Sequence, residues 1–315
     1  MNDAKPLDGK VAIVTGAAGG VGRATVELLT RRGASVVAED VDANVAQLEA
    51  PNVAAVSGDV RKAETARKAV ETALSRFGRL DILVNNAAVI ITKDILSTGE
   101  DEWNDLMAVN VTGVFHHCRA VLPEMIRQKS GSIVSVSSIS GLVGLPLQAA
   151  YCASKGAIVQ LTRQLAVDYA EHGVRVNSVA PGSIDTPFLT RYLDSQPDPV
   201  AAERAIKAAH PIGRIGSPQE IAEAIASSPP TPRPSSPARS CRQTAATWRD
   251  DCGQPVRLVL RSRRHGLDRR KGRLDADQPR RSRLRTILRQ RLTQTSAFRC
   301  RAGCPPALGN GADGA

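Results

Sequence analysis

Tyr151 and Lys155 have the residue types and the spacing that proton transfer requires. Side chains four residues apart lie on one face of a helix, so the ammonium group would stand beside the phenol. Free tyrosine has a pKa of about 10. A neighbouring cation stabilises the phenolate, and we therefore expect Lys155 to lower the pKa of Tyr151 towards the working pH.

Each of these residues also has an ordinary interpretation. Taken singly, Tyr151 fits a half-buried helix tyrosine and Lys155 fits a solvated charge. Ser138 lies thirteen positions before Tyr151, at the end of a predicted strand, where its hydroxyl would hold a substrate oxygen against the tyrosine. The combination of the three favours the catalytic interpretation.

A glycine-rich stretch, "TGAAGGVG" at Thr15–Gly22, lies between an apolar run and a helical pattern. Gly16 would allow a tight turn, Gly20 would let the backbone approach a pyrophosphate, and Gly22 would permit close packing of helix on strand. The helix that follows would direct its N-terminal N–H groups at the phosphates. In this context the stretch predicts dinucleotide binding in preference to a plain loop.

Two carboxylates, Glu39 and Asp40, end the second predicted strand about 20 residues further on. A carboxylate here can accept hydrogen bonds from both ribose hydroxyls of NAD and would repel the additional phosphate of NADP. The glycine-rich stretch has no Lys or Arg to favour that phosphate. We expect NAD rather than NADP, bound through Asp40; the alternative is a solvated acidic loop.

Apolar runs alternate with helical patterns along the first 226 residues. Buried runs that break at glycine or polar residues predict strands covered on both faces. This alternation predicts an α/β fold, a Rossmann-like doubly wound parallel sheet with the carboxyl ends of its strands at one edge. The six predicted strands are "KVAIVTG", "ASVVAED", "NVAAVSGD", "LDILVNNAA", "GSIVSVSS" and "VRVNSVAPG", with long helices over about 102–127 and 150–172.

With "NNAA" at 85–88 and "YCASK" at 151–155, these motifs resemble the short-chain dehydrogenase/reductase family over roughly residues 7–226. Ala88 departs from the last glycine of the family's Asn-Asn-Ala-Gly motif. The resemblance implies the catalytic set Asn110, Ser138, Tyr151 and Lys155, with Asn110 anchoring a water in a proton relay. It implies cofactor contacts from Thr15, Gly16, Gly20, Val21, Gly22, Asp40, Asp59, Val60, Asn86, Ala87, Tyr151, Lys155, Pro181, Gly182, Ile184 and Thr186, and no metal.

The resemblance further implies an oxidoreductase that transfers a hydride between NAD(H) and a secondary alcohol or ketone. Residues from Ser183 to about His210 would form a partly apolar lid over this small-molecule substrate. No apolar run reaches membrane-spanning length, and the acidic start "MNDAKPLDGK" lacks the pattern of a signal peptide, which predicts a cytoplasmic protein. The complete catalytic set argues against a catalytically dead binding protein.

The composition changes after Ala226. Residues 1–226 contain 22 Lys and Arg against 25 Asp and Glu, whereas residues 227–315 contain 20 against 6. Four prolines between Pro229 and Pro234 exclude a continuing helix or central strand. We therefore expect a dehydrogenase domain over 1–226 and a disordered basic tail over 227–315, in which Cys300 and Cys304 do not form a metal site.

Two explanations of the tail remain open. Loss of one base at the boundary of Ala226 and Ser227 would allow residues 227–250 to be re-read as "FLASDASSFVTGAVLPADGGYMAR", which contains the seventh strand and the glycine-rich ending of the family. The given chain would then have lost that strand and the homo-oligomer that the family's C-terminus supports. The alternative is an impaired, truncated dehydrogenase whose arginines bind nucleic acid or an anionic surface. Arg-, Pro- and Ser-rich composition also arises from GC-rich DNA out of frame, so we favour the first explanation.

Overall fold

The structure is a computed structural model that describes residues 5–194 and 196–227, and all elements named below lie in this part. Its strands arise from the short apolar runs, because β-branched residues pack well in a sheet that is covered on both faces. All five residues of the first run, VAIVT, are buried. The strands are β1 (Val11–Thr15), β2 (Ser35–Asp40), β3 (Val53–Ser57), β4 (Ile82–Asn85), β5 (Gly131–Val136) and β6 (Val174–Val179).

These strands form one parallel sheet in the order β3-β2-β1-β4-β5-β6. The order reverses between β1 and β4, where Ala12 pairs with Ile82 and Val14 with Val84. This is the doubly wound sheet that the sequence predicts, so the fold class is confirmed. In such sheets ligands bind outside the carboxyl ends of the strands at the reversal, which places the site beside the glycine-rich turn.

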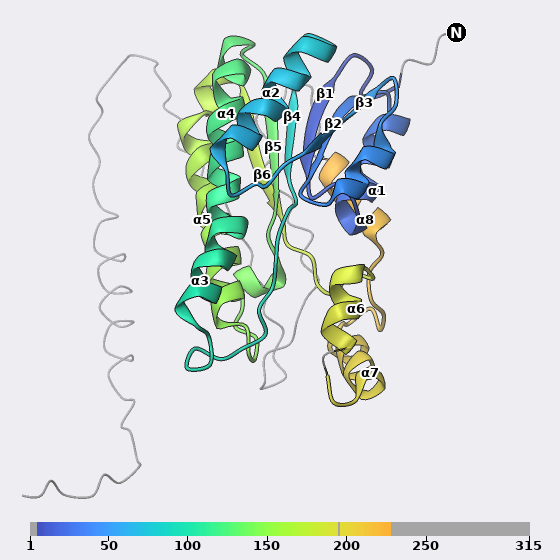
Figure 1. Ribbon diagram of the computed structural model, residues 1–315, viewed down its shortest axis with the longest axis vertical. Coiled ribbons are helices and arrows are strands. Elements are labelled where there is room, and N and C mark those ends of the chain that lie inside the picture. The colour runs from blue at the N-terminus through green and yellow to red at the C-terminus, as the bar shows by residue number, and fades with distance from the viewer. Residues whose placement is uncertain (1–4, 195, 228–315) are drawn as a thin grey trace, which may run out of the picture. The chain divides into compact units, whose positions relative to one another are not determined.

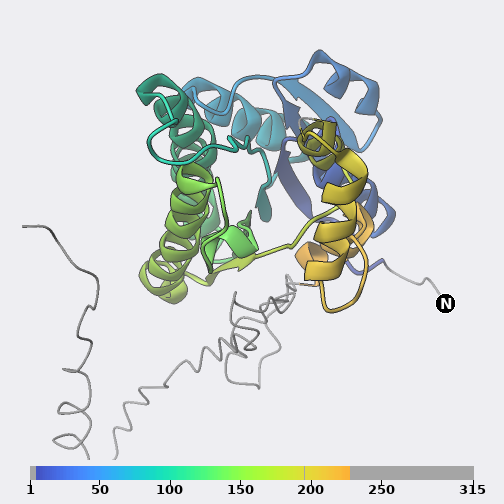
Figure 2. The ribbon, with the colours of Figure 1, turned by 90° about the horizontal axis from the view of Figure 1, so that it is seen from below.

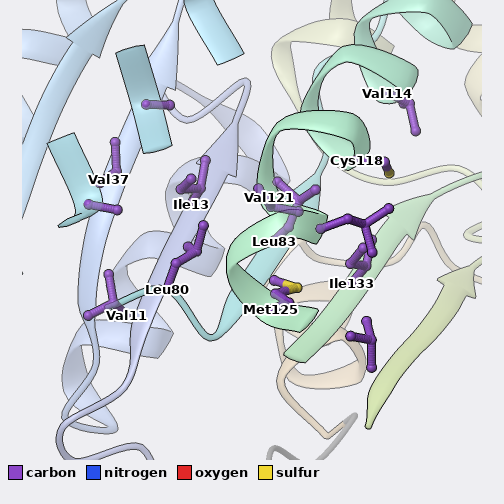
Figure 3. Packing of buried hydrophobic residues seen from close by; sticks show 14 of the residues in the cluster. Val11, Ile13, Val37, Leu80, Leu83, Val114, Cys118, Val121, Met125 and Ile133 are labelled. Atoms are coloured by element: carbon purple, nitrogen blue, oxygen red, sulfur yellow. The ribbon is translucent and has the colours of Figure 1, made fainter. Parts of the chain in front are cut away.

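Helices cover both faces of the sheet (Figure 1). Successive side chains of a strand point to opposite faces: Ala12 and Val14 of β1 belong to the core under α1 and α8, and Val11 and Ile13 to the core under α2, α4 and α5. Figure 3 shows the core under α2, α4 and α5, where Val121 and Met125 pack on Leu83 and Ile133. The helices are α1 (Gly20–Arg31), α2 (Ala63–Phe77), α4 (Gly113–Arg127), α5 (Ala149–Asp168) and α8 (Pro218–Ala226).

The long helix predicted over 102–127 has an interruption that the sequence does not reveal. It consists of α3 (Glu100–Met107), a π-helical turn at Ala108–Thr112, and α4. Insertions of this kind occur frequently at functional sites, and this one carries Asn110. The helix predicted over 150–172 ends at Asp168, followed by a short 3₁₀ turn that closes at Gly173 with a φ of 74°.

The segment after β6 contains two helices where the sequence predicts a lid, α6 (Pro187–Asp194) and α7 (Pro199–Ala209). Helix α8 begins at a capping box in which Ser217 and Glu220 bond each other's backbone N–H groups. It packs through Ala222 on α1. The predicted basic tail and the predicted loss of a seventh strand concern residues outside the described ones.

A cluster of charges links the segments that lead into β1 and β4. Asp81 is 3% exposed and accepts hydrogen bonds from Lys10 Nζ at 3.0 Å, from Arg79 at 2.7 Å on each oxygen, and from the Val11 N–H at 3.1 Å. Burial raises the pKa of Asp81, but the hydrogen bonds from Arg79 and Lys10 outweigh it and hold the pKa below its usual value. The ionised carboxylate therefore stabilises the fold.

We expect Asp81→Ala to lower the free energy of unfolding by about 2 kcal/mol, since it removes charge-assisted hydrogen bonds at a buried group. The control is Glu27→Ala, whose ion pair with Arg23 is about half exposed and contributes at most about 0.5 kcal/mol. Because the pKa of Asp81 is lowered in the folded state, its contribution is complete above the unfolded pKa and disappears as the pH falls through the folded one. Urea titrations at neutral and acidic pH measure both effects; equal losses in the two variants would contradict the expectation.

Candidate active site

A cavity of about 1070 Å³ lies at the carboxyl edge of the sheet. Figure 2 shows this edge from below, with α5 and α6 on opposite sides of it. Thr15, Gly22 and Asn110 of the predicted site lie outside its lining. The predicted residues that line it are Gly16, Gly20, Val21, Asp40, Asp59, Val60, Asn86, Ala87, Ser138, Tyr151, Lys155, Pro181, Gly182, Ile184 and Thr186.

The glycine-rich turn has a backbone that other residues cannot adopt without strain. Gly16 and Gly20 have φ values of 66° and 51°, in the left-handed region that favours glycine. A Cβ at Gly22 would lie 1.9 Å from the Gly16 carbonyl oxygen, which is a severe clash. The turn is therefore packed directly against the first turn of α1, whose N-terminus has no side-chain cap among the described residues. This arrangement fits a diphosphate.

The turn is fixed to the segment after β4 by a small hydrogen-bond network. Thr15 Oγ1 accepts from the N–H groups of Asn86 at 3.0 Å and Ala87 at 3.1 Å. Asn86 Nδ2 donates to the carbonyl oxygens of Thr15 and Gly16, both at 3.0 Å. Thr15 thus acts from behind the cavity wall, by holding residues that line it.

Asp40 ends β2 at one end of the cavity. Its Oδ2 accepts from the Ala18 N–H at 2.8 Å, and its Oδ1 accepts from the Asp42 N–H at 2.9 Å. The carboxylate is half-buried and is held against the glycine-rich turn. These contacts orient the carboxylate within the wall that a dinucleotide's ribose would face.

The segment after β3 supplies the adjoining wall. Asp59 Oδ2 accepts from Arg61 Nε at 2.8 Å, and this hydrogen bond lowers the pKa of the Asp59 carboxyl. Arg61 also pairs with Asp105 at 3.2 Å. Val60 packs on the start of α4, where a Cβ at Gly113 would lie 3.0 Å from Val60.

Tyr151 and Lys155 lie on one face of α5, as predicted, and both are buried. Lys155 Nζ is 5.6 Å from the centre of the tyrosine ring and donates to the Val136 carbonyl oxygen at 2.8 Å. Burial lowers the pKa of Lys155 to about 8. The ammonium group is thus held near the phenol by a strand that ends beside it.

The direction of the tyrosine shift differs from the one that the sequence pattern predicts. Burial raises the pKa of Tyr151 to about 12, against a smaller lowering by its hydrogen bond with Ser138. The expected net lowering does not occur, because desolvation of the phenol dominates and the Lys155 ammonium group donates to the Val136 carbonyl. In this structure Tyr151 is a protonated acid at neutral pH.

Ser138 belongs to a chain of hydroxyl groups that the motif alone does not reveal. Its Oγ accepts from the Ser140 N–H at 3.1 Å and donates to Ser140 Oγ at 3.2 Å. Ser140 in turn donates to Gln148 Oε1 at 2.8 Å. Ser140 and Gln148 line the cavity; their closeness to Ser138 and Tyr151 in the sequence is the signal that could have found them.

Asn110 is buried, and its amide bonds both backbone groups and a serine hydroxyl. Its Oδ1 accepts from the Val89 N–H at 2.8 Å, while its Nδ2 donates to the Val89 carbonyl at 2.9 Å and to Ser154 Oγ at 3.1 Å. The side chain therefore holds the segment after β4 against α5. Its role in anchoring a relay water stays a prediction.

The opposite end of the cavity is closed by the segment after β6. The Ser183 N–H donates to His210 Nε2 at 3.0 Å, which links this segment to the end of α7. The ring of Phe188 in α6 lies 6.3 Å from the ring of Tyr151. The region predicted as a substrate lid thus contacts the predicted catalytic residue.

In the part of the chain that the structure describes, no group of three or more His, Cys, Asp or Glu side chains could hold a metal ion. Its helices include none long and apolar enough to cross a membrane. Its two cysteines, Cys118 and Cys152, are free, and burial raises the pKa of the Cys118 thiol to about 12, so Cys118 is unreactive at neutral pH.

Comparison with known proteins agrees with this geometry. Residues 10–197 match the family described as short chain dehydrogenase. The 2-(S)-hydroxypropyl-CoM dehydrogenase 3 of Xanthobacter autotrophicus is 40% identical over 229 residues, 70% of this chain and 89% of the relative. Levodione reductase has a TM-score of 0.67 at 31% identity, over 70% of this chain and 90% of that structure. A 3-ketoacyl-(acyl-carrier-protein) reductase from Brucella melitensis, complexed with NADH, has a TM-score of 0.65 at 32% identity over the same shares.

The matched residues include both ends of the cavity. They contain the glycine-rich turn and Asp40 at one end, and Tyr151 and Lys155 at the other. The order of the strands is the doubly wound one, and the relative from Xanthobacter autotrophicus is 40% identical over 89% of its own length. Both observations agree with the family match. The chain belongs to the short-chain dehydrogenase family and is an oxidoreductase of that family.

Proposed function

We propose that residues 1–226 catalyse hydride transfer between NAD(H) and a secondary alcohol or its ketone. One observation carries this: a single cavity has the glycine-rich turn and Asp40 at one end and Ser138, Tyr151 and Lys155 at the other. The first end has the glycine cradle and the carboxylate that a dinucleotide requires. The second end has a proton carrier with a hydroxyl beside it.

The cavity residues would divide the work as follows. Bound NAD supplies the hydride-accepting ring, and the protein supplies the proton path. Tyr151 takes the hydroxyl proton during oxidation and returns it during reduction, while Ser138 holds the substrate oxygen. Lys155, kept beside the phenol by Val136, stabilises the phenolate that oxidation requires before Tyr151 can accept the proton.

The substrate end of the cavity is mostly apolar, which favours a small, weakly polar molecule. Its lining there includes Ile90, Leu145, Phe188 and Leu189, with Arg191 as a cation on α6. The names of the relatives, a hydroxypropyl-CoM dehydrogenase and a levodione reductase, refer to a secondary alcohol and to a ketone. We extend that reaction class, and no individual substrate, to this chain.

We further propose that residues after 226 are out of frame, because charge and proline content change there. The alignment with the Xanthobacter relative covers 70% of this chain but 89% of the relative, so nearly all of the relative is matched without most of the residues after 226. The coding DNA around Ala226 tests this, since a sequence that cannot encode the recovered ending in another frame would exclude it. For the chain with the recovered ending we also propose a homo-oligomer like those of the family, and a cytoplasmic location.

We expect Tyr151→Phe to reduce kcat/KM by about 10³-fold, the usual contribution of a positioned proton carrier, while the Kd for NADH changes little. Tyr169→Phe, at the end of the same helix, is the matched control and should keep its activity. The assay is a panel of secondary alcohols with NAD. If the 315-residue protein is inactive, both variants are compared in a chain with the recovered ending after residue 226. Parental activity in Tyr151→Phe would end the proposal.

The pKa values give an expected pH profile for ketone reduction. With its pKa raised to about 12, Tyr151 stays protonated and able to donate. Lys155, with its pKa lowered to about 8, loses its charge as the pH rises through that value. A charged Lys155 stabilises the phenolate that Tyr151 becomes when it donates its proton to the ketone oxygen. The kcat/KM for reduction should therefore be level below about pH 7 and fall above about pH 8. Lys155→Arg, which remains charged, should be slower but without that fall; a parental profile that stays level through pH 9 would contradict this.

Cofactor preference tests the role of Asp40. Asp40→Ala should raise the KM for NAD about 10-fold, because one charged hydrogen bond is lost. It should also relax the preference for NAD over NADP. Asp42→Ala, which removes a neighbouring carboxylate that caps the turn 43–48, is the control and should keep that preference. A parent protein that prefers NADP would show that this interpretation of Asp40 is wrong.

A further inference from the structure

Glu39 in β2 and His117 in α4 form a buried ionisable pair that has no part in the proposed mechanism. Glu39 is 0% exposed and His117 is 1% exposed. His117 Nε2 lies 3.0 Å from Glu39 Oε2, and His117 Nδ1 lies 2.8 Å from the Gly113 carbonyl oxygen. Neither side chain lines the cavity.

The two hydrogen bonds fix the orientation of the imidazole. Gly113 offers an acceptor to Nδ1, so Nδ1 carries a proton, and Nε2 shares a proton with Glu39 Oε2. Burial lowers the pKa of His117, but the hydrogen bond and charge of Glu39 outweigh it and raise that pKa. The imidazole is therefore held between Glu39 and Gly113 by two directed hydrogen bonds.

Stability alone does not account for this pair. Burying an ionisable pair has a large desolvation cost, and a well-packed apolar pair in the same place is often as stable or more stable. Moreover, Glu39 Oε1 has no hydrogen-bond partner among the described residues. A costly and incompletely satisfied pair of this kind calls for a role in fixing geometry.

The Glu39 end of the pair belongs to the cofactor end of the cavity. Its own carbonyl oxygen accepts from the Ala17 N–H at 3.0 Å, inside the glycine-rich turn. The next residue, Asp40, accepts from the Ala18 N–H at 2.8 Å. The side chain of Glu39 points to the opposite face from Asp40, the face of Val37, which packs in the core under α4 (Figure 3).

The His117 end fixes the start of α4. It bonds the carbonyl of Gly113, the residue that lies closely against Val60 of the adjoining cavity wall. Gly113 directly follows the π-helical turn that carries Asn110. The pair is therefore a direct side-chain connection between the Asp40 strand end and the helix that supports Val60.

We propose that Glu39 and His117 are positioning residues for the cofactor, which hold Asp40 and the glycine-rich turn at a fixed spacing from Val60 and the start of α4. This inference rests on the proposed NAD-dependent function. Loosening the connection separates the walls that would contact the adenosine half of NAD and leaves Tyr151 and Ser138 in place. It should weaken cofactor binding and leave the chemical step unchanged.

The test uses the full chain and an apolar double variant, Glu39→Met with His117→Phe, which removes both charges and keeps the volume. We expect its melting temperature to equal or exceed that of the parent, while its Kd for NADH and for ADP-ribose rises about 10-fold and kcat at saturating NAD stays within about 2-fold. Glu39→Gln is the conservative variant, because its amide can donate to a neutral His117 and keep both hydrogen bonds; it should retain the parental Kd. His116→Phe, one position away on α4, is the matched control.

The outcomes separate this inference from the proposed function. A stable double variant with the parental Kd would overturn the inference and leave a merely structural pair. A Glu39→Gln variant as weak as the double variant would also overturn it, since geometry would then not be what matters. Failure of the parent to bind NADH, both as the 315-residue protein and with the recovered ending after residue 226, would overturn both this inference and the proposed function.

Discussion

The structure depends on the close contact between the glycine-rich turn and its surroundings at the reversal of strand order. At Gly22 only a hydrogen atom fits against the Gly16 carbonyl, and at Gly16 a Cβ would lie 2.8 Å from Ala87. Because the turn touches both α1 and the segment after β4, it fixes the two halves of the sheet relative to each other. The hydrogen bonds of Thr15 and Asn86 satisfy the polar groups that this contact buries. The cavity has its shape because these backbones lie so close together.

The buried charges are distributed unequally between the two faces of the sheet. The core under α1 and α8 is made of Ala, Val, Leu and Ile side chains, and it contributes stability without directed interactions. The face under α4 and α5 also carries Glu39, His117 and Lys155. Each of these charges is held by a hydrogen bond to backbone or to its partner. The second face therefore loses stability to desolvation and gains fixed positions for groups that act on the cavity.

Local patterns were sufficient to predict the strands and the site motifs. The six strands of the described part correspond to the apolar runs, because burial on both faces leaves an unmistakable composition. The glycine-rich turn and the pair Tyr151 and Lys155 depend on residues close in sequence, and their spacing was informative. The π-helical turn at Ala108–Thr112 was not predictable. Its five residues, AVNVT, are too few to show whether the apolar spacing follows an α-helix or a π-helix. The pairing of Glu39 with His117 joins residues 78 positions apart, which no local pattern reveals.

The wrong direction for the Tyr151 pKa has a related cause. A sequence shows that a cation stands four residues away, but it does not show how deeply the phenol is buried or what else the cation bonds. Burial of Tyr151 favours its neutral form, and the Val136 carbonyl holds the ammonium group beside the ring. Burial also lowers the pKa of Lys155 to about 8 while it raises that of Tyr151 to about 12, so the two pKa values move apart. With its pKa raised, Tyr151 keeps its proton at neutral pH, and it becomes a base only to the extent that a further positive charge beside it favours the phenolate. The pKa of Tyr151 in this structure is thus set by desolvation first and by the hydrogen bond with Ser138 second.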